Sequence, residues 1–157
     1  MLQIRTASPP DYEGMLAVAR SLPEWFNAQG LREMATDLKT QQGFLAVCQS
    51  GGTDRVVGFV TWLPRSADVS LVELTWLGVD PQFQRRGLGR SLVDAVADRC
   101  RQIGIFVMEV TTLADSVDYA PYAGTRAFYR RIGFQDWRVD KDFYGPGDDR
   151  LVLRKYL

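Results

Sequence analysis

Residues Leu71 to Ile103 read LVELTWLGVDPQFQRRGLGRSLVDAVADRCRQI, and this stretch decides the fold. Its first part, Leu71–Val79, is an apolar run that predicts a buried strand. Asp80-Pro81 ends that strand, because proline has no N–H group to offer a sheet ladder. Downstream, apolar residues recur at helical spacing and predict a helix from near Gly87; they are Leu88, Leu92, Ala95, Val96, Cys100 and Ile103. The hexapeptide Gln84–Gly89 therefore joins a strand to a helix.

This hexapeptide has the composition of an anion-binding loop. Gly87 and Gly89 let the backbone approach a ligand without a Cβ atom in the way. The free N–H groups and the positive dipole end of the new helix favour a negative charge. Arg85, Arg86 and Arg90 add positive side chains. A phosphate or pyrophosphate is the expected ligand.

Composition limits the function classes that remain. The 157 residues suit one compact domain, and 19 basic against 19 acidic side chains leave no net charge. A general electrostatic role on nucleic acid or at a membrane surface therefore has no support. The absence of histidine removes histidine–metal sites and Ser-His or Cys-His nucleophile pairs, and no metal is expected. Cys48 and Cys100 are expected to be buried, reduced thiols. The sequence shows no signal-peptide pattern and no long apolar run, which predicts a cytoplasmic protein.

Alternation, helical spacing and turn residues predict the remaining elements. Strands are expected at Leu2–Thr6, Phe44–Gln49, Val56–Leu63, Leu71–Val79, Ile105–Leu113, Phe134–Phe143 and Arg150–Tyr156. Helices are expected from Ser8 or Asp11 to Ser21, and at Leu31–Lys39, Gly87–Ile103 and Tyr122–Ile132. Leu22–Gly30 is expected to be a loop, Ser50–Asp54 a hairpin turn, and Pro64–Asp68 a turn into the central strand. The order β-α-α-β-β-β-α-β-α-β-β implies one mixed α/β sheet covered by helices.

Three kinds of glycine-rich phosphate loop compete for the hexapeptide. A P-loop ends in Gly-Lys-Ser/Thr, whereas Gly89 is followed by Arg90-Ser91 and the first glycine of that motif is missing. A dinucleotide-binding fingerprint needs a third glycine where Leu92 stands, and an early place in the chain. Both fit poorly. The third kind is the pyrophosphate loop of a coenzyme A site.

Two blocks of the chain occur in the order found in one known family. Gln84–Gly89 reads QRRGLG after a strand that ends in Val79-Asp80-Pro81, and Ala127–Phe134 reads AFYRRIGF. Together they resemble the Gln/Arg-x-x-Gly-x-Gly/Ala and Ala-x-x-Phe-Tyr-x-x-x-Gly-Phe signatures of the GNAT superfamily of N-acetyltransferases. The resemblance implies the GNAT fold, an α/β (α+β) mixed, mostly antiparallel sheet of about seven strands flanked by about four helices. It also implies that residues 1–157 form a single GNAT domain.

The resemblance implies roles for individual residues toward acetyl-CoA. Backbone N–H groups of Arg86–Ser91 would hold its pyrophosphate, and the strand backbone at Leu77 and Val79 would meet its pantetheine arm. The expected cofactor-binding residues are Leu77, Gly78, Val79, Gln84, Arg85, Arg86, Gly87, Leu88, Gly89, Arg90 and Ser91. Tyr129 would be the catalytic general acid for the leaving sulfur, since the pKa of a tyrosine, about 10, is close to that of an alkyl thiol. Many members of that family have asparagine at the position of Tyr122, so the pantetheine contact made from that position in the family is not carried over to this chain.

The expected reaction is direct attack of an amine on a thioester, which needs a group to accept the proton of the amine. Glu73 lies inside an otherwise apolar central strand, where burying a charge is costly without a reason. It is the second catalytic candidate, as a base acting directly or through water. The alternative is a residue at the rim of the strand, bonded to a side chain of a neighbouring strand.

The acceptor-binding candidates are less sharply defined. Trp25 and Phe26, in the loop between two predicted helices, either pack against the sheet or line a lid over the acceptor. Asp118 and Tyr119, before the last helix, and Tyr144, in the last hairpin, are further candidates, together with Glu73.

We therefore expect an acetyl-CoA-dependent N-acetyltransferase that acts on a primary amine of a small molecule or peptide. Its expected partners include no nucleic acid and no membrane, and a homodimer is compatible with the resemblance. The alternative is a non-catalytic acyl-CoA-binding sensor or interaction module on the same fold.

Overall fold

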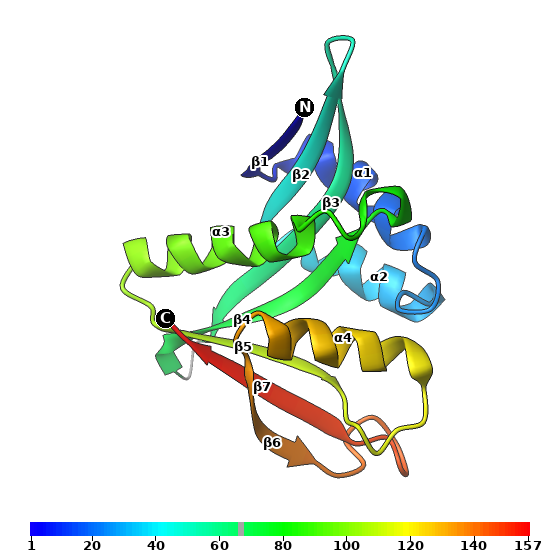
Figure 1. The fold of residues 1–157 in the computed structure, drawn as a ribbon, viewed down its shortest axis with the longest axis vertical. Coiled ribbons are helices and arrows are strands. Elements are labelled where there is room, and N and C mark those ends of the chain that lie inside the picture. The colour runs from blue at the N-terminus through cyan, green and yellow to red at the C-terminus, as the bar shows by residue number, and fades with distance from the viewer. Residues whose placement is uncertain (66–67) are drawn as a thin grey trace. The chain divides into compact units, whose positions relative to one another are not determined.

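The computed structural model describes residues 1–65 and 68–157 (Figure 1). Its strands are β1 Leu2–Thr6, β2 Gln42–Ser50, β3 Thr53–Arg65, β4 Asp68–Val79, β5 Val107–Leu113, β6 Gln135–Asp140 and β7 Arg150–Tyr156. Its helices are α1 Tyr12–Arg20, α2 Ala28–Asp37, α3 Leu88–Gln102 and α4 Ala120–Arg131, with short 3-10 turns at Pro9–Asp11 and Pro81–Phe83. The predicted succession of strands and helices is confirmed.

The strands are hydrogen-bonded in the order β1-β2-β3-β4-β5-β7-β6. The pairs β1/β2, β2/β3, β5/β7 and β6/β7 are antiparallel, and β4/β5 is parallel. A mixed, mostly antiparallel sheet of seven strands is the predicted fold class. Within residues 1–65 and 68–157, no helix combines the length and apolar character needed to cross a membrane.

The chain divides into two compact units. Unit 1 comprises Met1–Leu63 with Leu74–Ile103, and unit 2 comprises Pro64–Glu73 with Gly104–Leu157. That the whole chain acts as one domain stays a prediction.

The core of unit 1 lies between its strands and its first two helices. The buried side chains of this cluster are Met15, Val18, Ala19, Leu22, Phe26, Met34, Leu38, Leu45, Val47 and Phe59. On β3, a Cβ atom at Gly58 would stand 3.3 Å from Leu92 of α3. Because successive residues of a strand face opposite sides, Phe59 faces α1 and α2 while Gly58 faces α3. Helices therefore cover both faces of this part of the sheet.

Gly78 in β4 is required by the packing of that core. A Cβ atom on Gly78 would lie 2.9 Å from two ring carbons of Phe59 and 3.2 Å from Cδ1 of Leu22. Gly78→Ala is therefore expected to lower the free energy of unfolding by about 1–3 kcal/mol, as overpacking does, in urea titrations. Gly124→Ala in α4 is the matched control, because a Cβ atom there meets nothing within 4 Å. An equal loss in both variants would contradict the packing argument.

In unit 2, a charged face of the sheet lies opposite α4. Glu73 and Arg154 are the register partners of Glu109 on its two sides, in β4 and β7. Residues in register point to the same face of a sheet, so these three side chains share one face. Lys155, the next residue of β7, points to the other face and donates to the Ile132 carbonyl at the end of α4 (2.7 Å). The charges therefore lie on the face that α4 leaves open.

The start predicted for the second helix, Leu31, is wrong. The helix α2 begins at Ala28, because the Asn27 side chain caps it and Oδ1 accepts the Gly30 N–H at 2.8 Å. The predicted loop consequently ends at Asn27 rather than at Gly30.

Two predicted features of strand ends are also wrong. The strand predicted to reach Phe143 ends at Asp140, because Asp142 has a left-handed φ of 55° and its Oδ1 accepts the Gly147 N–H at 2.7 Å. The strand β3 continues through Pro64 to Arg65, where a turn was expected. Residues 66–67, also in that expected turn, lie outside the described part of the chain.

The two cysteines are free, as expected, but only Cys100 is fully buried. Burial raises the pKa of the Cys100 thiol to about 11. Cys48 is half-buried, because the outer half of β2 is not covered as fully as its centre.

Candidate functional site

The hexapeptide forms the predicted turn between β4 and α3 in unit 1. Gly87 is the residue before the helix and has φ of 77°, a left-handed conformation that favours glycine. The first helical rung is the Ser91 N–H to the Gly87 carbonyl, at 3.0 Å. The N–H groups of Leu88, Gly89 and Arg90 precede that rung and have no acceptor within the helix. They point from a helix N-terminus, which is where anions bind.

The approach to this turn is held by Asp80. Its Oδ1 accepts the Gln82 N–H at 2.9 Å, and its Oδ2 receives Nη2 of Arg55 at 2.8 Å. Its own N–H donates to the Val57 carbonyl at 2.8 Å, which ties the turn to β3. The Gln84 amide adds a bond to the Val79 carbonyl at 3.0 Å. These four bonds fix the shape of the loop.

Asp80→Ala is expected to lower the free energy of unfolding by about 1–2 kcal/mol, the usual cost of losing a capping carboxylate. Thermal unfolding measures the stability of this variant and of a control, Asp94→Ala, which removes a carboxylate from an exposed ion pair in α3. That control should change stability by less than about 0.5 kcal/mol. Equal effects would mean that Asp80 does not hold the turn.

Arginines surround the loop. The Arg86 guanidinium lies over the Phe83 ring, 5.1 Å from its centroid, and Arg55 lies 5.7 Å from the same ring. Arg85 is exposed and has a left-handed φ of 62°. Nε of Arg90 lies 3.7 Å from Oδ2 of Asp94, one turn further along α3. The sequence analysis did not single out Phe83 as the ring that these arginines contact. Its place between a proline and an arginine pair could have indicated that role.

The predicted pantetheine contacts lie in β4. In the described chain, its parallel pairing with β5 covers Leu71 to Glu73. Leu77 and Val79 lie beyond that pairing and are half-buried, and Gly78 is buried between them. Their backbone groups are consistent with the predicted use of this strand, which stays a prediction.

Tyr129 is buried in unit 2. Its ring meets Phe134 edge-on at 5.4 Å and Phe128 at 5.2 Å, both centroid to centroid. Burial, and secondarily the nearby Tyr122, raises the pKa of the Tyr129 phenol well above its usual value. The hydroxyl therefore keeps its proton at physiological pH, but it is a weaker acid than the ordinary tyrosine on which the expected match to an alkyl thiol was based.

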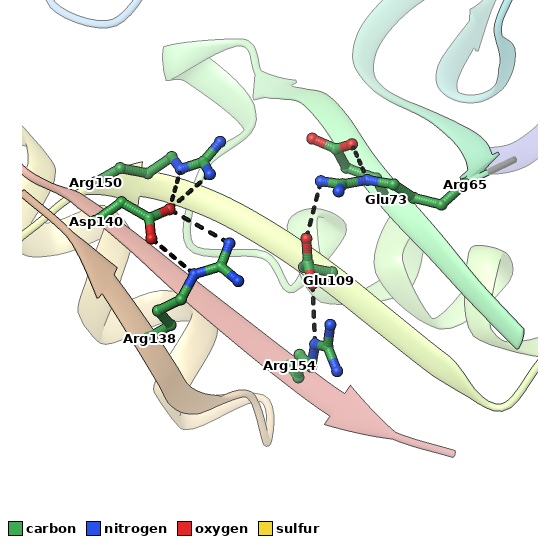
Figure 2. Close-up of polar contacts among 7 residues, drawn as sticks. All are labelled: Arg65, Glu73, Glu109, Arg138, Asp140, Arg150 and Arg154. Carbon is green, nitrogen blue, oxygen red and sulfur yellow. Dashed lines mark hydrogen bonds and ion pairs between the residues drawn. The ribbon is translucent and has the colours of Figure 1, made fainter. Parts of the chain in front are cut away.

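Glu73 is not isolated in β4. Its Oε2 receives Nε of Arg65 at 3.1 Å, which is the bond to a neighbouring strand that the alternative to a catalytic base expected (Figure 2). Beside it on β5, Glu109 is buried and receives Arg65 at 3.0 Å and Arg154 at 2.9 Å. Sequence reasoning missed Glu109, although a carboxylate within an apolar strand is the signal that singled out Glu73.

Tyr144 is influenced by the charge of Glu73. Burial raises the pKa of its phenol; Thr111 and Arg150 lower it, and the charges of Glu73 and Asp140 raise it further. Tyr119 stacks at an angle on Tyr122, with ring centroids 5.7 Å apart. Asp118 is exposed on the same loop.

Trp25 and Phe26 belong to unit 1. Phe26 is buried, and its ring contacts Phe59 at 6.0 Å and Trp76 at 5.8 Å between centroids. Of the two expected roles, packing against the sheet is the one seen for Phe26. Trp25 is only partly buried against the same core. An acceptor contact from either stays a prediction.

A family model described as an acetyltransferase (GNAT) domain matches residues 40–136. The N-alpha-acetyltransferase RimI of Mycobacterium tuberculosis is 31% identical over 134 residues, covering 83% of this chain and 75% of that protein. A mycothiol acetyltransferase of Kocuria rhizophila is 35% identical over 103 residues, covering 63% of this chain and 32% of that protein. The chain thus spans about a third of the length of the mycothiol acetyltransferases that it matches.

Solved structures show the same fold. A GNAT-family protein from Desulfovibrio desulfuricans superposes with a TM-score of 0.85 at 25% identity, over 99% of both chains. Others of this fold were solved with coenzyme A or acetyl-CoA, at 16–17% identity, a level that shows the fold alone.

Proposed function

Because the chain belongs to the GNAT acetyltransferase family, we propose that it is an acetyl-CoA-dependent N-acetyltransferase acting on a primary amine. The observation that supports the proposal is the turn at Gly87, where the first N–H groups of α3 lie beside several arginines, an arrangement that favours an anion such as pyrophosphate. A Cβ atom on Gly87 would meet nothing within 4 Å, so the turn has room for a phosphate.

Acetyl-CoA, as the co-substrate, supplies an acetyl group on a thioester. The residues Gln84–Ser91 hold its pyrophosphate, and the β4 backbone at Leu77–Val79 orients its arm. Such positioning lowers the barrier by making the reaction effectively unimolecular.

Two groups of unit 2 move protons in the proposed reaction. The carbon–nitrogen bond forms as the carbon–sulfur bond breaks, so one proton leaves the amine and one reaches the sulfur. Glu73, directly or through water, takes the first, and the buried Tyr129 gives the second. Burial raises the pKa of the phenol, so Tyr129 holds its proton until the thiolate forms beside it and takes it.

The proposed acceptor is a small molecule or a peptide. The candidate acceptor-binding residues of unit 2 are Glu73, Asp118, Tyr119 and Tyr144, and those of unit 1, considered separately, are Trp25 and Phe26. The likeness to an N-alpha-acetyltransferase, over most of both chains, supports a peptide α-amine as the first acceptor to try. A cytoplasmic location and a homodimer complete the proposal, and light scattering would test the second.

The test is release of free CoA thiol from acetyl-CoA with a panel of peptides, amino sugars and small amines, each product checked by mass spectrometry. Acceptor-dependent release with an acetylated product is expected. Acetyl-CoA binding by calorimetry with no release on any acceptor would favour the acyl-CoA sensor instead. A chain that binds no acetyl-CoA would contradict both.

A further inference from the structure

A line of alternating charges crosses the face of unit 2 that lies opposite α4 (Figure 2). Nε of Arg154 donates to Oε2 of Glu109 at 2.9 Å, and Nη2 of Arg65 donates to Oε1 of Glu109 at 3.0 Å. Nε of the same Arg65 donates to Oε2 of Glu73 at 3.1 Å. The far end is fixed by Trp137, whose ring centroid lies 3.5 Å from the Arg154 guanidinium carbon. The line therefore joins β6, β7, β5, β3 and β4.

The two carboxylates of this line differ in freedom. Glu109 is 2% exposed, and each of its oxygens receives an arginine. The Glu73 side chain is 23% exposed and is bonded through Oε2. A buried carboxylate is tolerated when it is paired in this way, and it then has little freedom to move. Glu109 is the fixed anchor, and Glu73 is the end that an amine can reach.

Arg65 offsets the electrostatic repulsion between the carboxylates of Glu73 and Glu109. Glu73 and Glu109 are register partners in the parallel ladder of β4 and β5. Like charges in register repel each other across a sheet. The planar guanidinium of Arg65 offers one donor to each, a fork that the point charge of a lysine cannot reproduce. The position of the Glu73 carboxylate thus depends on Arg65, and that of Arg65 depends on Glu109.

We infer that Arg65 and Glu109 are positioning residues that hold the Glu73 carboxylate in its place for the acceptor amine. The inference rests on the proposed function, in which Glu73 takes the proton of that amine. Neither Arg65 nor Glu109 touches the substrate in this scheme. Each acts through Glu73.

A second cluster on the same face provides a matched control. Asp140 receives Arg138 at 2.7 Å and Arg150 at 2.6 Å. In Figure 2 no dashed line joins this cluster to the line that ends at Glu73. The two share the ring of Trp137, whose centroid lies 4.6 Å from the Arg138 guanidinium carbon and 3.5 Å from that of Arg154. The side chains of Arg138 and Arg65 are 44% and 41% exposed, so their replacement disturbs comparable surfaces.

The test compares Arg65→Met, Arg65→Lys and Arg138→Met, each with and without Glu73→Gln, using the best acceptor of the panel. Arg65→Met is expected to lower kcat by about 10- to 100-fold, the effect of a misplaced catalytic group, with KM for acetyl-CoA within about twofold. Arg65→Lys keeps the charge and should recover part of kcat. Arg138→Met should leave kcat within about twofold. In the Glu73→Gln background, Arg65→Met should cost less than about twofold more, because its effect passes through Glu73.

An Arg65→Met loss that persists undiminished in the Glu73→Gln background would overturn the inference, since it would show a structural role. Melting temperatures of the same variants give a readout that needs no activity. If the wild-type chain acetylates no amine, the proposed function fails, and these temperatures test the network alone. Non-additive shifts for Arg65 and Glu73 would support the coupling, and additive shifts would overturn it.

Discussion

Replacing Gly89 by valine is expected to raise the dissociation constant for acetyl-CoA by about 100-fold or more, equivalent to about 2.8 kcal/mol of lost binding. Gly89 is the second residue of α3, and its N–H is one of those proposed to hold the pyrophosphate. A branched side chain there would stand where the pyrophosphate approaches the backbone. Isothermal calorimetry on the folded variant gives the affinity directly.

The fold itself should tolerate this change, because valine is a better helix former than glycine. Gly124→Val in α4 introduces the same side chain into another helix, at a position with nothing within 4 Å of the Cβ atom. Its acetyl-CoA affinity should match that of the wild type. If Gly89→Val also binds normally, the pyrophosphate site lies elsewhere.

The turn at Gly87 could be predicted because its signals are local. A strand that stops at Pro81, two glycines and a helical repeat all lie within one continuous stretch, and the structure forms the turn there. Single residues mark the starts of two helices: Gly87 precedes α3, and the capping Asn27 precedes α2. The first was read correctly, whereas the second was overlooked and the start of α2 was misplaced.

The surroundings of Glu73 could not be predicted because they are built from distant residues. Arg65 and Arg154 reach Glu109 from positions 44 and 45 residues away. Their meeting depends on which strands become neighbours, and an arginine near a strand end carries no sign of its partner. For Phe26, aromatic character was equally compatible with a lid and a core, and only its burial between α1 and β3 favours the core.

Tyr129→Phe is expected to lower kcat by about 100- to 1,000-fold, the usual contribution of a general acid, while acetyl-CoA affinity stays within about twofold. The change removes one oxygen from a ring packed between Phe128 and Phe134, and it leaves that packing in place. Steady-state kinetics and calorimetry separate the two effects. Tyr156→Phe, at an exposed tyrosine of β7, is the control and should be silent.

The pH dependence of stability gives an independent measure of the same hydroxyl. Burial raises the pKa of Tyr129 in the folded chain above the value of about 10 in the unfolded chain. The stabilisation from the retained proton is therefore complete below pH 10 and is lost as the pH rises further, because only the unfolded chain then releases the proton readily. The wild-type melting temperature should fall more steeply above pH 10 than that of Tyr129→Phe. If the melting temperatures of the two proteins fall in parallel above pH 10, the phenol is open to water. In the kinetic experiment, a loss of kcat matched by an equal loss of acetyl-CoA affinity would make Tyr129 a structural residue.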